Sequence, residues 1–209
     1  MISERPIGAG EIPFSQEILR KTTHMGALIV PGVYWWLGLS KALMLGIMIP
    51  STCLMVAIDV ARLRNLGFWR NFACKIGGRM VRSHESAGDF TGATYILLSA
   101  CCVIAMFDKP VAVAALAFII VGDTLAALIG RKFGRHKFGH KSVEGSLACL
   151  VGTVAVALLV PQLSLTVGLS GAVVATVVEA LSTKIDDNIS VPVLSGLAMT
   201  LLISILSTP

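Results

Sequence analysis

The sequence has 209 residues, of which 55% are hydrophobic and only 14% are charged, and its mean hydropathy is +0.82. Soluble domains average about 25% charged residues, so this composition excludes an ordinary water-soluble domain. The net charge of +5 does not indicate nucleic-acid binding, because the basic residues lie between hydrophobic segments and are not interleaved with aromatic ones.

Seven apolar segments approach or reach the length of about 17 to 25 residues that a helix needs to cross a bilayer. We predict spans at 24–39, 42–61, 90–107, 111–130, 144–160, 164–181 and 190–206. Between the second and third spans, residues 63–83 alternate large apolar side chains with arginines and lysines, which predicts an interfacial amphipathic helix. The sequence therefore predicts an all-α polytopic membrane protein in which residues 1–209 form one catalytic domain.

The basic residues predict the orientation of these spans. Seven spans place 15 of the 17 lysines and arginines on one side of the membrane and leave only Lys41 and Lys109 on the other. The positive-inside rule makes the first side cytoplasmic, and we expect the plasma membrane of a prokaryote. The N-terminus and the active site should then face the cytoplasm, which would contain residues 1–22, 62–89, 131–143 and 182–189.

Six acidic residues lie inside the spans or at their cytoplasmic ends: Asp59, Asp123, Glu144, Glu179, Asp186 and Asp187. A carboxylate near lipid costs at least about 2.5 kcal/mol on insertion scales, so each one needs a metal ion or a basic partner. An ordinary interfacial ion pair explains any single member of this set. The occurrence of all six at one membrane level favours a functional site.

Two groups in the N-terminal half have helical spacing. Four polar residues can share one helix face at the start of the first span: Glu17, Arg20, Lys21 and His24. A positive-inside anchor explains Arg20 and Lys21 equally well. Asp59 and Arg62, three residues apart at the end of the second span, suit an orienting ion pair.

The loop after the fourth span carries five lysines and arginines between glycines and leads into a helix expected to begin at Ser142. Backbone N–H groups and a helix N-terminus bind anions, so this loop is typical of a polyphosphate site. Residues 134–142 resemble a P-loop, but the stretch has one residue too many and lies between membrane helices without a preceding strand. We therefore reject a Walker A site.

The loop after the sixth span is rich in hydroxyl and carboxylate groups. If that helix continued for two turns, Glu179, Ser182 or Thr183, and Asp186 would line up on one face. Such oxygen ligands are those that Mg2+ prefers, usually together with water and substrate phosphates. The alternative is an ordinary solvated loop.

Two stretches resemble the family of dolichol kinase, phytol kinase and CTP-dependent diacylglycerol kinase: GDTLAALIGRKFGRHKFGHKSVEGSLA at 122–148 and EALSTKIDDNISVP at 179–192. Further support comes from 17–24, 59–62, Glu85 and 91–95. The resemblance implies transfer of the γ-phosphate of CTP to the hydroxyl of a membrane alcohol, with Mg2+ as cofactor. The alcohol would be a polyprenol such as dolichol, a phytol-like isoprenoid or diacylglycerol.

This resemblance implies a role for each matching residue. Mg2+ would be held by three aspartates: Asp123, Asp186 and Asp187. The nucleotide would be bound by Arg131, Lys132, Lys137, His140, Lys141, Ser142, Lys184 and Asn188. Glu144 or Glu179 would orient or deprotonate the lipid hydroxyl, with Asp123 and Lys141 also catalytic. Supporting positions are Lys21, His24, Asp59, Arg62 and Glu85.

Two other functions remain open. The stretch 122–148 is also similar to phosphatidate cytidylyltransferase, although STKIDDN replaces that family's downstream K-D...H-G-G...D-R-x-D pattern. A cytidylyltransferase would release pyrophosphate, whereas a kinase would release CDP. A small transporter would also use buried acidic residues, but near the bilayer midplane and with access from both sides.

Overall fold

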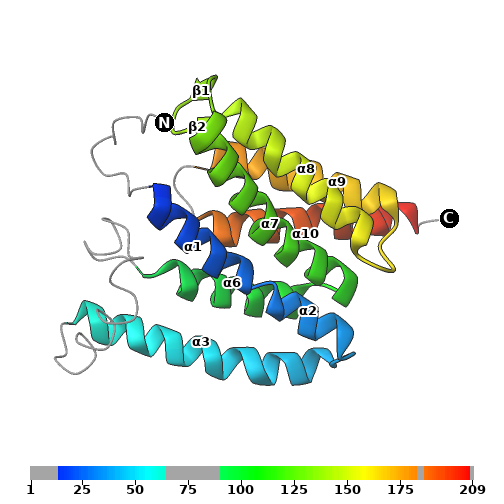
Figure 1. Ribbon diagram of the computed structural model, residues 1–209. Helices are drawn as coiled ribbons and strands as arrows, with labels where there is room; N and C mark the ends of the chain where they lie inside the picture. The colour runs from blue at the N-terminus through cyan, green and yellow to red at the C-terminus, as the bar shows by residue number, and fades with distance from the viewer. Residues whose placement is uncertain (1–13, 65–89, 183–185, 208–209) are drawn as a thin grey trace.

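Apolar residues dominate the chain, and in the computed structural model they form helices (Figure 1). The structure describes residues 14–64, 90–182 and 186–207. Its helices are α1 (Phe14–Gly26), α2 (Ile29–Trp36), α3 (Lys41–Leu63), α6 (Gly92–Met106), α7 (Lys109–Phe133), α8 (Val143–Leu159), α9 (Leu165–Leu181) and α10 (Asp187–Leu206). A short antiparallel hairpin, β1 (Lys137–Phe138) and β2 (Lys141–Ser142), connects α7 to α8.

Three helices, α3, α7 and α10, are long and apolar enough to cross a membrane. With 25 residues, α7 is about 37 Å long at 1.5 Å per residue. The helices α6, α8 and α9 are apolar but have only 15 or 17 residues. Six of the predicted spans thus coincide with apolar helices, in agreement with an all-α membrane protein. The number of seven spans is not confirmed.

The first predicted span, 24–39, is divided into two helices. The helix α1 ends at Gly26, and α2 has only eight residues, which extend about 12 Å. Pro31 explains the break, because its ring would collide with the carbonyl group four residues earlier in a continuous helix. Lys21 and His24 therefore belong to a separate polar helix. The predicted interfacial helix at 63–83 lies outside the described residues, except for its first two positions.

The helix α7 lies at the centre of the bundle, where it packs against α8, α10, α2, α1 and α9. Most side chains in its first half are buried, and Phe118 is completely so. In contrast, α3 packs mainly on α6 at the edge of the bundle. Leu43, Ile47 and Leu54 on α3 are exposed. Such an apolar outer face suits contact with lipid.

Two glycines of α8 bring this helix very close to α7. A Cβ atom on Gly145 would lie 2.9 Å from the carbonyl oxygen of Ala126 and 3.2 Å from Cα of Gly130. A Cβ atom on Gly152 would lie 2.5 Å from Cδ1 of Leu125. Larger residues would separate the two helices, so these glycines fix the position of the hairpin relative to α7.

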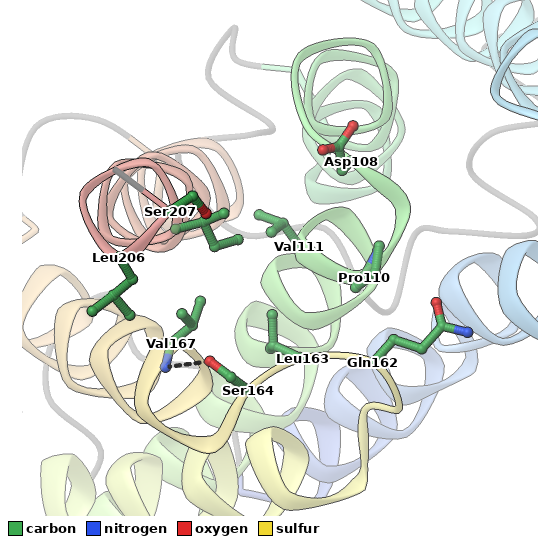
Figure 2. Close-up of a pocket in the computed structure, with 10 residues that line it drawn as sticks. Asp108, Pro110, Val111, Gln162, Leu163, Ser164, Val167, Leu206 and Ser207 are labelled. Carbon is green, nitrogen blue, oxygen red and sulfur yellow. Dashed lines mark hydrogen bonds between the residues drawn. The ribbon is translucent and has the colours of Figure 1, made fainter. Parts of the chain in front are cut away.

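The two ends of the bundle differ in character. The C-terminal ends of α3, α7 and α9 and the N-terminal ends of α6, α8 and α10 gather at the left of Figure 1. This charged end contains most of the acidic residues described above. At the opposite end, Asp108, Gln162, Ser164 and Ser207 line a cavity of about 370 Å³ together with apolar residues (Figure 2).

Candidate active site

The first polar contact at the charged end joins α1 to α7. Lys21 is 1% exposed, and its Nζ donates a short hydrogen bond to Oδ2 of Asp123. His24, one helical turn further along α1, places Nε2 3.5 Å from the same oxygen. Burial lowers the pKa of Lys21, and the negative charge of Asp123 opposes this effect. Asp123 is the acidic residue of α7 and lies about 15 Å before the end of this helix.

The second polar contact joins the hairpin to α9 and α10. Nζ of Lys141 lies 2.9 Å from Oε1 of Glu179 and 3.1 Å from Oδ2 of Asp187, and it also donates to the backbone carbonyl of Glu179. Burial disfavours the charged form of Lys141. The hydrogen bonds and negative charges of Glu179 and Asp187 outweigh burial and raise its pKa, so Lys141 is a cation throughout the neutral range.

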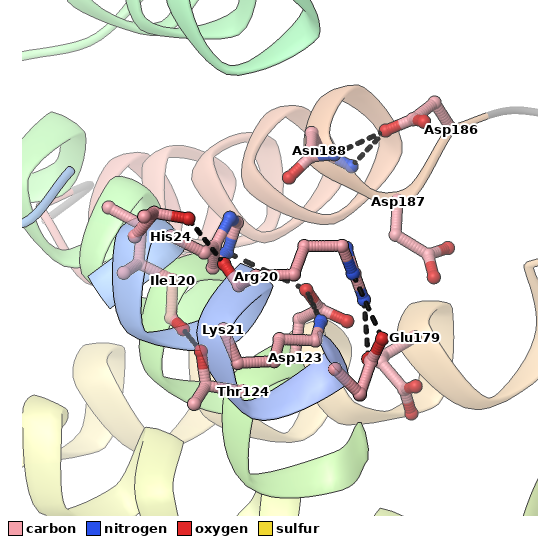
Figure 3. A network of polar contacts seen from close by, with 12 residues as sticks. Arg20, Lys21, His24, Ile120, Asp123, Thr124, Glu179, Asp186, Asp187 and Asn188 are labelled. Carbon is pink, nitrogen blue, oxygen red and sulfur yellow. Dashed lines mark hydrogen bonds and ion pairs between the residues drawn. The ribbon is translucent and has the colours of Figure 1, made fainter. Parts of the chain in front are cut away.

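These two contacts belong to one site. Figure 3 shows side chains from α1, α7, α9 and α10 directed into the same region. Glu179 experiences the negative charges of both Asp187 and Asp123, so the three carboxylates lie within electrostatic range of one another. The predicted convergence of acidic and basic groups from separate parts of the chain is therefore present in the structure for Lys21, Asp123, Lys141, Glu179 and Asp187.

Glu179 differs from the other carboxylates of this site in the pairing of its oxygens. Glu179 is 5% exposed. Its oxygen Oε2 is buried and has no hydrogen-bond partner among the described residues. Buried carboxylate oxygens are normally paired, because an unpaired one loses its hydration without compensation. The site therefore contains an acceptor that a bound donor can satisfy.

Glu17 on α1 pairs with one arginine of its own helix and with another in the last turn of α7. Arg20 donates to both carboxylate oxygens of Glu17, at 3.0 and 2.6 Å. Nη1 of Arg131 lies 3.8 Å from Oε2 of Glu17. Arg131, which was predicted to bind nucleotide, thus lies beside the polar face of α1.

The hairpin is closed by Glu144 and Ser142. Glu144 accepts hydrogen bonds from the backbone N–H of His136, and its Oε1 lies 2.9 Å from Nδ1 of the same residue. Ser142 is buried and caps α8 by accepting from the N–H of Gly145 at 3.2 Å. The predicted start of this helix at Ser142 is confirmed. The contacts of Glu144 are local to the hairpin.

Three of the basic residues predicted to bind nucleotide are exposed at the end of α7 and on the hairpin: Lys132, Lys137 and His140. Nζ of Lys132 lies 5.2 Å from the ring centre of Phe133. Lys137 pairs with Ser142 across the hairpin, and His140 follows the turn at Gly139. These side chains are open to solvent, whereas Lys141 points inward.

The loop after α9 does not continue as a helix, because α9 ends at Leu181 and Asp186 begins a new one. The conditional alignment of Glu179 with Asp186 on one helix face is therefore wrong. Oδ1 of Asp186 accepts from the backbone and side-chain amides of Asn188, at 2.9 and 2.6 Å, and caps α10. Oδ1 of Asn188 is buried and has no partner in the described structure. Lys184 lies outside the described residues.

A separate network holds the ends of α3 and α6 together. Oδ2 of Asp59, which is 1% exposed, accepts from the backbone N–H of Thr91 at 2.8 Å and from the hydroxyls of Thr91 and Thr94 at 2.9 and 2.6 Å. Its Oδ1 accepts from Nε of Arg62 at 3.1 Å. Both oxygens are therefore used, which fits the predicted orienting ion pair. Glu85, the other supporting residue, lies outside the described residues.

Within the described ranges, no three His, Cys, Asp or Glu side chains are grouped closely enough to hold a metal ion by themselves. Mg2+ is usually held by one or two carboxylates together with water and substrate phosphates, so this observation is compatible with a nucleotide-bound ion. Asp123 and Asp187 lie within electrostatic range of each other. Asp186 is directed at Asn188 (Figure 3).

Sequence reasoning missed two features of this site. One is the bond between His136 and Glu144, because a spacing of eight residues across a turn has no periodic signal. The other is the hairpin itself, whose strands have only two residues each. Gly139, which adopts a positive φ in the structure, was the residue in the sequence that could have indicated a turn between them.

Comparisons with known proteins bear on the function. No protein-family model matches the chain. An uncharacterized protein of Rickettsia prowazekii is 29% identical over 198 residues, which cover 90% of this chain and 95% of that protein. CTP-dependent diacylglycerol kinase 1 of Saccharomyces cerevisiae is 28% identical over 222 aligned positions, which cover 93% of this chain and 76% of the kinase. No solved structure matches. The similarity to a lipid kinase extends over most of the chain and supports a lipid kinase at the level of a distant family relationship.

Proposed function

We propose that this protein is a membrane kinase that transfers the γ-phosphate of CTP to the hydroxyl of a lipid alcohol. The observation that carries the proposal is the joining of Lys21–Asp123 and Lys141–Glu179–Asp187 into one charged site at the end of an apolar bundle. The distant similarity to a CTP-dependent diacylglycerol kinase supports the donor and the class of acceptor.

The chemistry of phosphoryl transfer suits this arrangement, because it requires mainly positioning and neutralisation of charge. Asp123 and Asp187, with Asp186 nearby in sequence, would hold Mg2+, which would neutralise negative charge on the phosphates. Arg131 and the exposed cations of the hairpin would neutralise the triphosphate. Lys21 is the cationic partner of Asp123 in the structure.

The membrane setting favours a lipid acceptor. The charged site lies where apolar helices end, and the outward faces of α3 and α8 carry exposed leucines, isoleucines and valines. A lipid whose tail lies against such helices presents its hydroxyl near the level of the charged groups. Diacylglycerol, a phytol-like alcohol and a polyprenol all meet this requirement. We place the site on the cytoplasmic side, where CTP is made available to the enzyme, in accordance with the distribution of basic residues.

The test is an assay of purified protein with CTP labelled in the γ-phosphate, Mg2+ and a panel of lipid alcohols. We expect label in the lipid fraction and release of CDP. If CTP labelled in the α-phosphate transfers its label to phosphatidate and pyrophosphate is released, the protein is a cytidylyltransferase instead. Protein that transfers label from neither position is not a CTP-dependent lipid enzyme.

A further inference from the structure

Glu144 and Glu179 are two glutamates at the charged end whose carboxylates could accept a proton from a substrate hydroxyl. Their surroundings distinguish them. Both oxygens of Glu144 accept from His136, and the carboxylate closes the hairpin at a position where the side chain is 25% exposed. Glu144 is thus already occupied by a structural contact.

The carboxylate of Glu179 is held in place by a hydrogen bond to one of its two oxygens only. Lys141 binds both Oε1 and the backbone carbonyl of Glu179, which fixes the carboxylate relative to the last turn of α9. The other oxygen, Oε2, is buried and has no partner among residues 14–64, 90–182 and 186–207. A hydroxyl group bound in the site would supply the missing donor.

We propose that Glu179 Oε2 is the atom that receives the proton of the lipid hydroxyl. This inference rests on the proposed function and assigns one residue within it. The lipid oxygen forms a bond to the γ-phosphorus of CTP while the bond from that phosphorus to the β-phosphate oxygen breaks. The hydroxyl proton moves to Oε2, and the products are the lipid phosphate and CDP.

The neighbours of Glu179 suit this role. Asp123 and Asp187 lie within electrostatic range of it, so a metal-bound phosphate that they held would lie in the same region as Glu179. Lys141 keeps Oε1 engaged as a hydrogen-bond acceptor, which leaves Oε2 as the oxygen that faces a substrate. Lys141 is accordingly a positioning residue for the base.

The first test compares Glu179→Gln with wild type in the transfer of label from γ-labelled CTP to dioleoylglycerol. General bases contribute about 10²- to 10⁴-fold, so we expect kcat to fall by about a thousandfold. Binding of CTP, measured by equilibrium dialysis, should be retained, and Glu179→Asp should recover part of the lost rate. Glu144→Gln should lose much less kcat than Glu179→Gln.

A second measurement separates proton removal from a structural role. In a diacylglycerol analogue with fluorine beside the hydroxyl-bearing carbon, the hydroxyl is more acidic and needs less help from a base. The defect of Glu179→Gln should therefore become smaller with this analogue, whereas a misfolded or mispositioned site would be equally slow with both acceptors. An equal defect overturns the assignment.

The remaining outcomes are also decisive. If wild type labels the lipid and Glu179→Gln does so at a similar rate, Glu179 is not the base although the proposed function stands. If Glu179→Gln loses CTP binding together with turnover, its role is structural. If wild type labels no lipid alcohol, the proposed function fails first.

Discussion

Asp59 and Glu179 are both buried carboxylates at the charged end of the bundle, but their hydrogen bonding differs. Asp59 uses both oxygens, with Thr91, Thr94 and Arg62 as donors. Glu179 uses Oε1 for Lys141 and leaves Oε2 without a partner in the described part of the chain. A saturated carboxylate fixes the ends of two helices, whereas a half-saturated one retains capacity for a ligand. The comparison separates the structural network around Asp59 from the network around Glu179 that we propose to be reactive.

The largest effect should follow from a change in the Lys21–Asp123 pair, which belongs to the proposed active site. Replacing Asp123 by Asn removes the negative charge that pairs with Lys21 and that would hold the metal. Loss of one preorganised electrostatic contact costs about 10²- to 10³-fold in kcat, so we expect transfer of γ-label to fall by at least that factor.

The control for Asp123→Asn is its behaviour as a membrane protein. Recovery from the membrane fraction and the elution profile in detergent should match those of wild type. A variant that retains wild-type turnover would remove Asp123 from the mechanism.

The next effect concerns stability. Lys141→Met leaves Glu179 and Asp187 close together without their shared cation, and breaking a buried ion pair costs about 3 to 5 kcal/mol. Because Lys141 and Asp187 keep 23% and 26% of their side chains exposed, we expect the lower end, about 3 kcal/mol. Unfolding of the purified protein in detergent measures this change.

Lys137→Met is the matched control for the lysine substitution. Lys137 lies on the same hairpin but is exposed, so its replacement should change the free energy of unfolding by less than about 0.5 kcal/mol. Equal losses in the two variants would show that the three-way contact of Lys141 does not stabilise the fold.

A smaller effect is expected in the saturated network. Asp59→Asn conserves size but leaves one acceptor oxygen in place of two, so its NH2 group must face either the donors of Thr91 and Thr94 or Nε of Arg62, which costs about 2 kcal/mol. Turnover should fall only in proportion to the folded fraction, because Asp59 holds helix ends. Measured per folded molecule, a loss as large as that of Asp123→Asn would place Asp59 in the reactive network and contradict the comparison.

The smallest effect is expected at the opposite end of the bundle. Asp108 precedes α7 beside the cavity of Figure 2, and its side chain makes no capping hydrogen bond. Asp108→Asn should therefore change the free energy of unfolding by less than about 0.5 kcal/mol and leave the rate of transfer unaltered. A substantial loss of turnover would indicate that the outer end contributes to function.

Much of the fold was predictable, because long apolar segments specify helices independently of their partners. The break before Pro31 had a local cause that the apolar pattern concealed. The residues that make up the candidate site were predictable from the sequence, but the contacts between them were not. Lys21 and Asp123 are 102 residues apart, and Lys141 and Glu179 are 38 apart. Sequence spacing does not specify such contacts, since they depend on which helices pack together.

The position of Lys141 links three parts of the candidate site. One ammonium group links the hairpin to the end of α9 and to the start of α10. In the proposed reaction the exposed cations of the hairpin would meet the triphosphate. A shift of the hairpin on arrival of the donor would then reach Glu179 through the Lys141 ammonium, and occupancy by the donor would be coupled to alignment toward the acceptor.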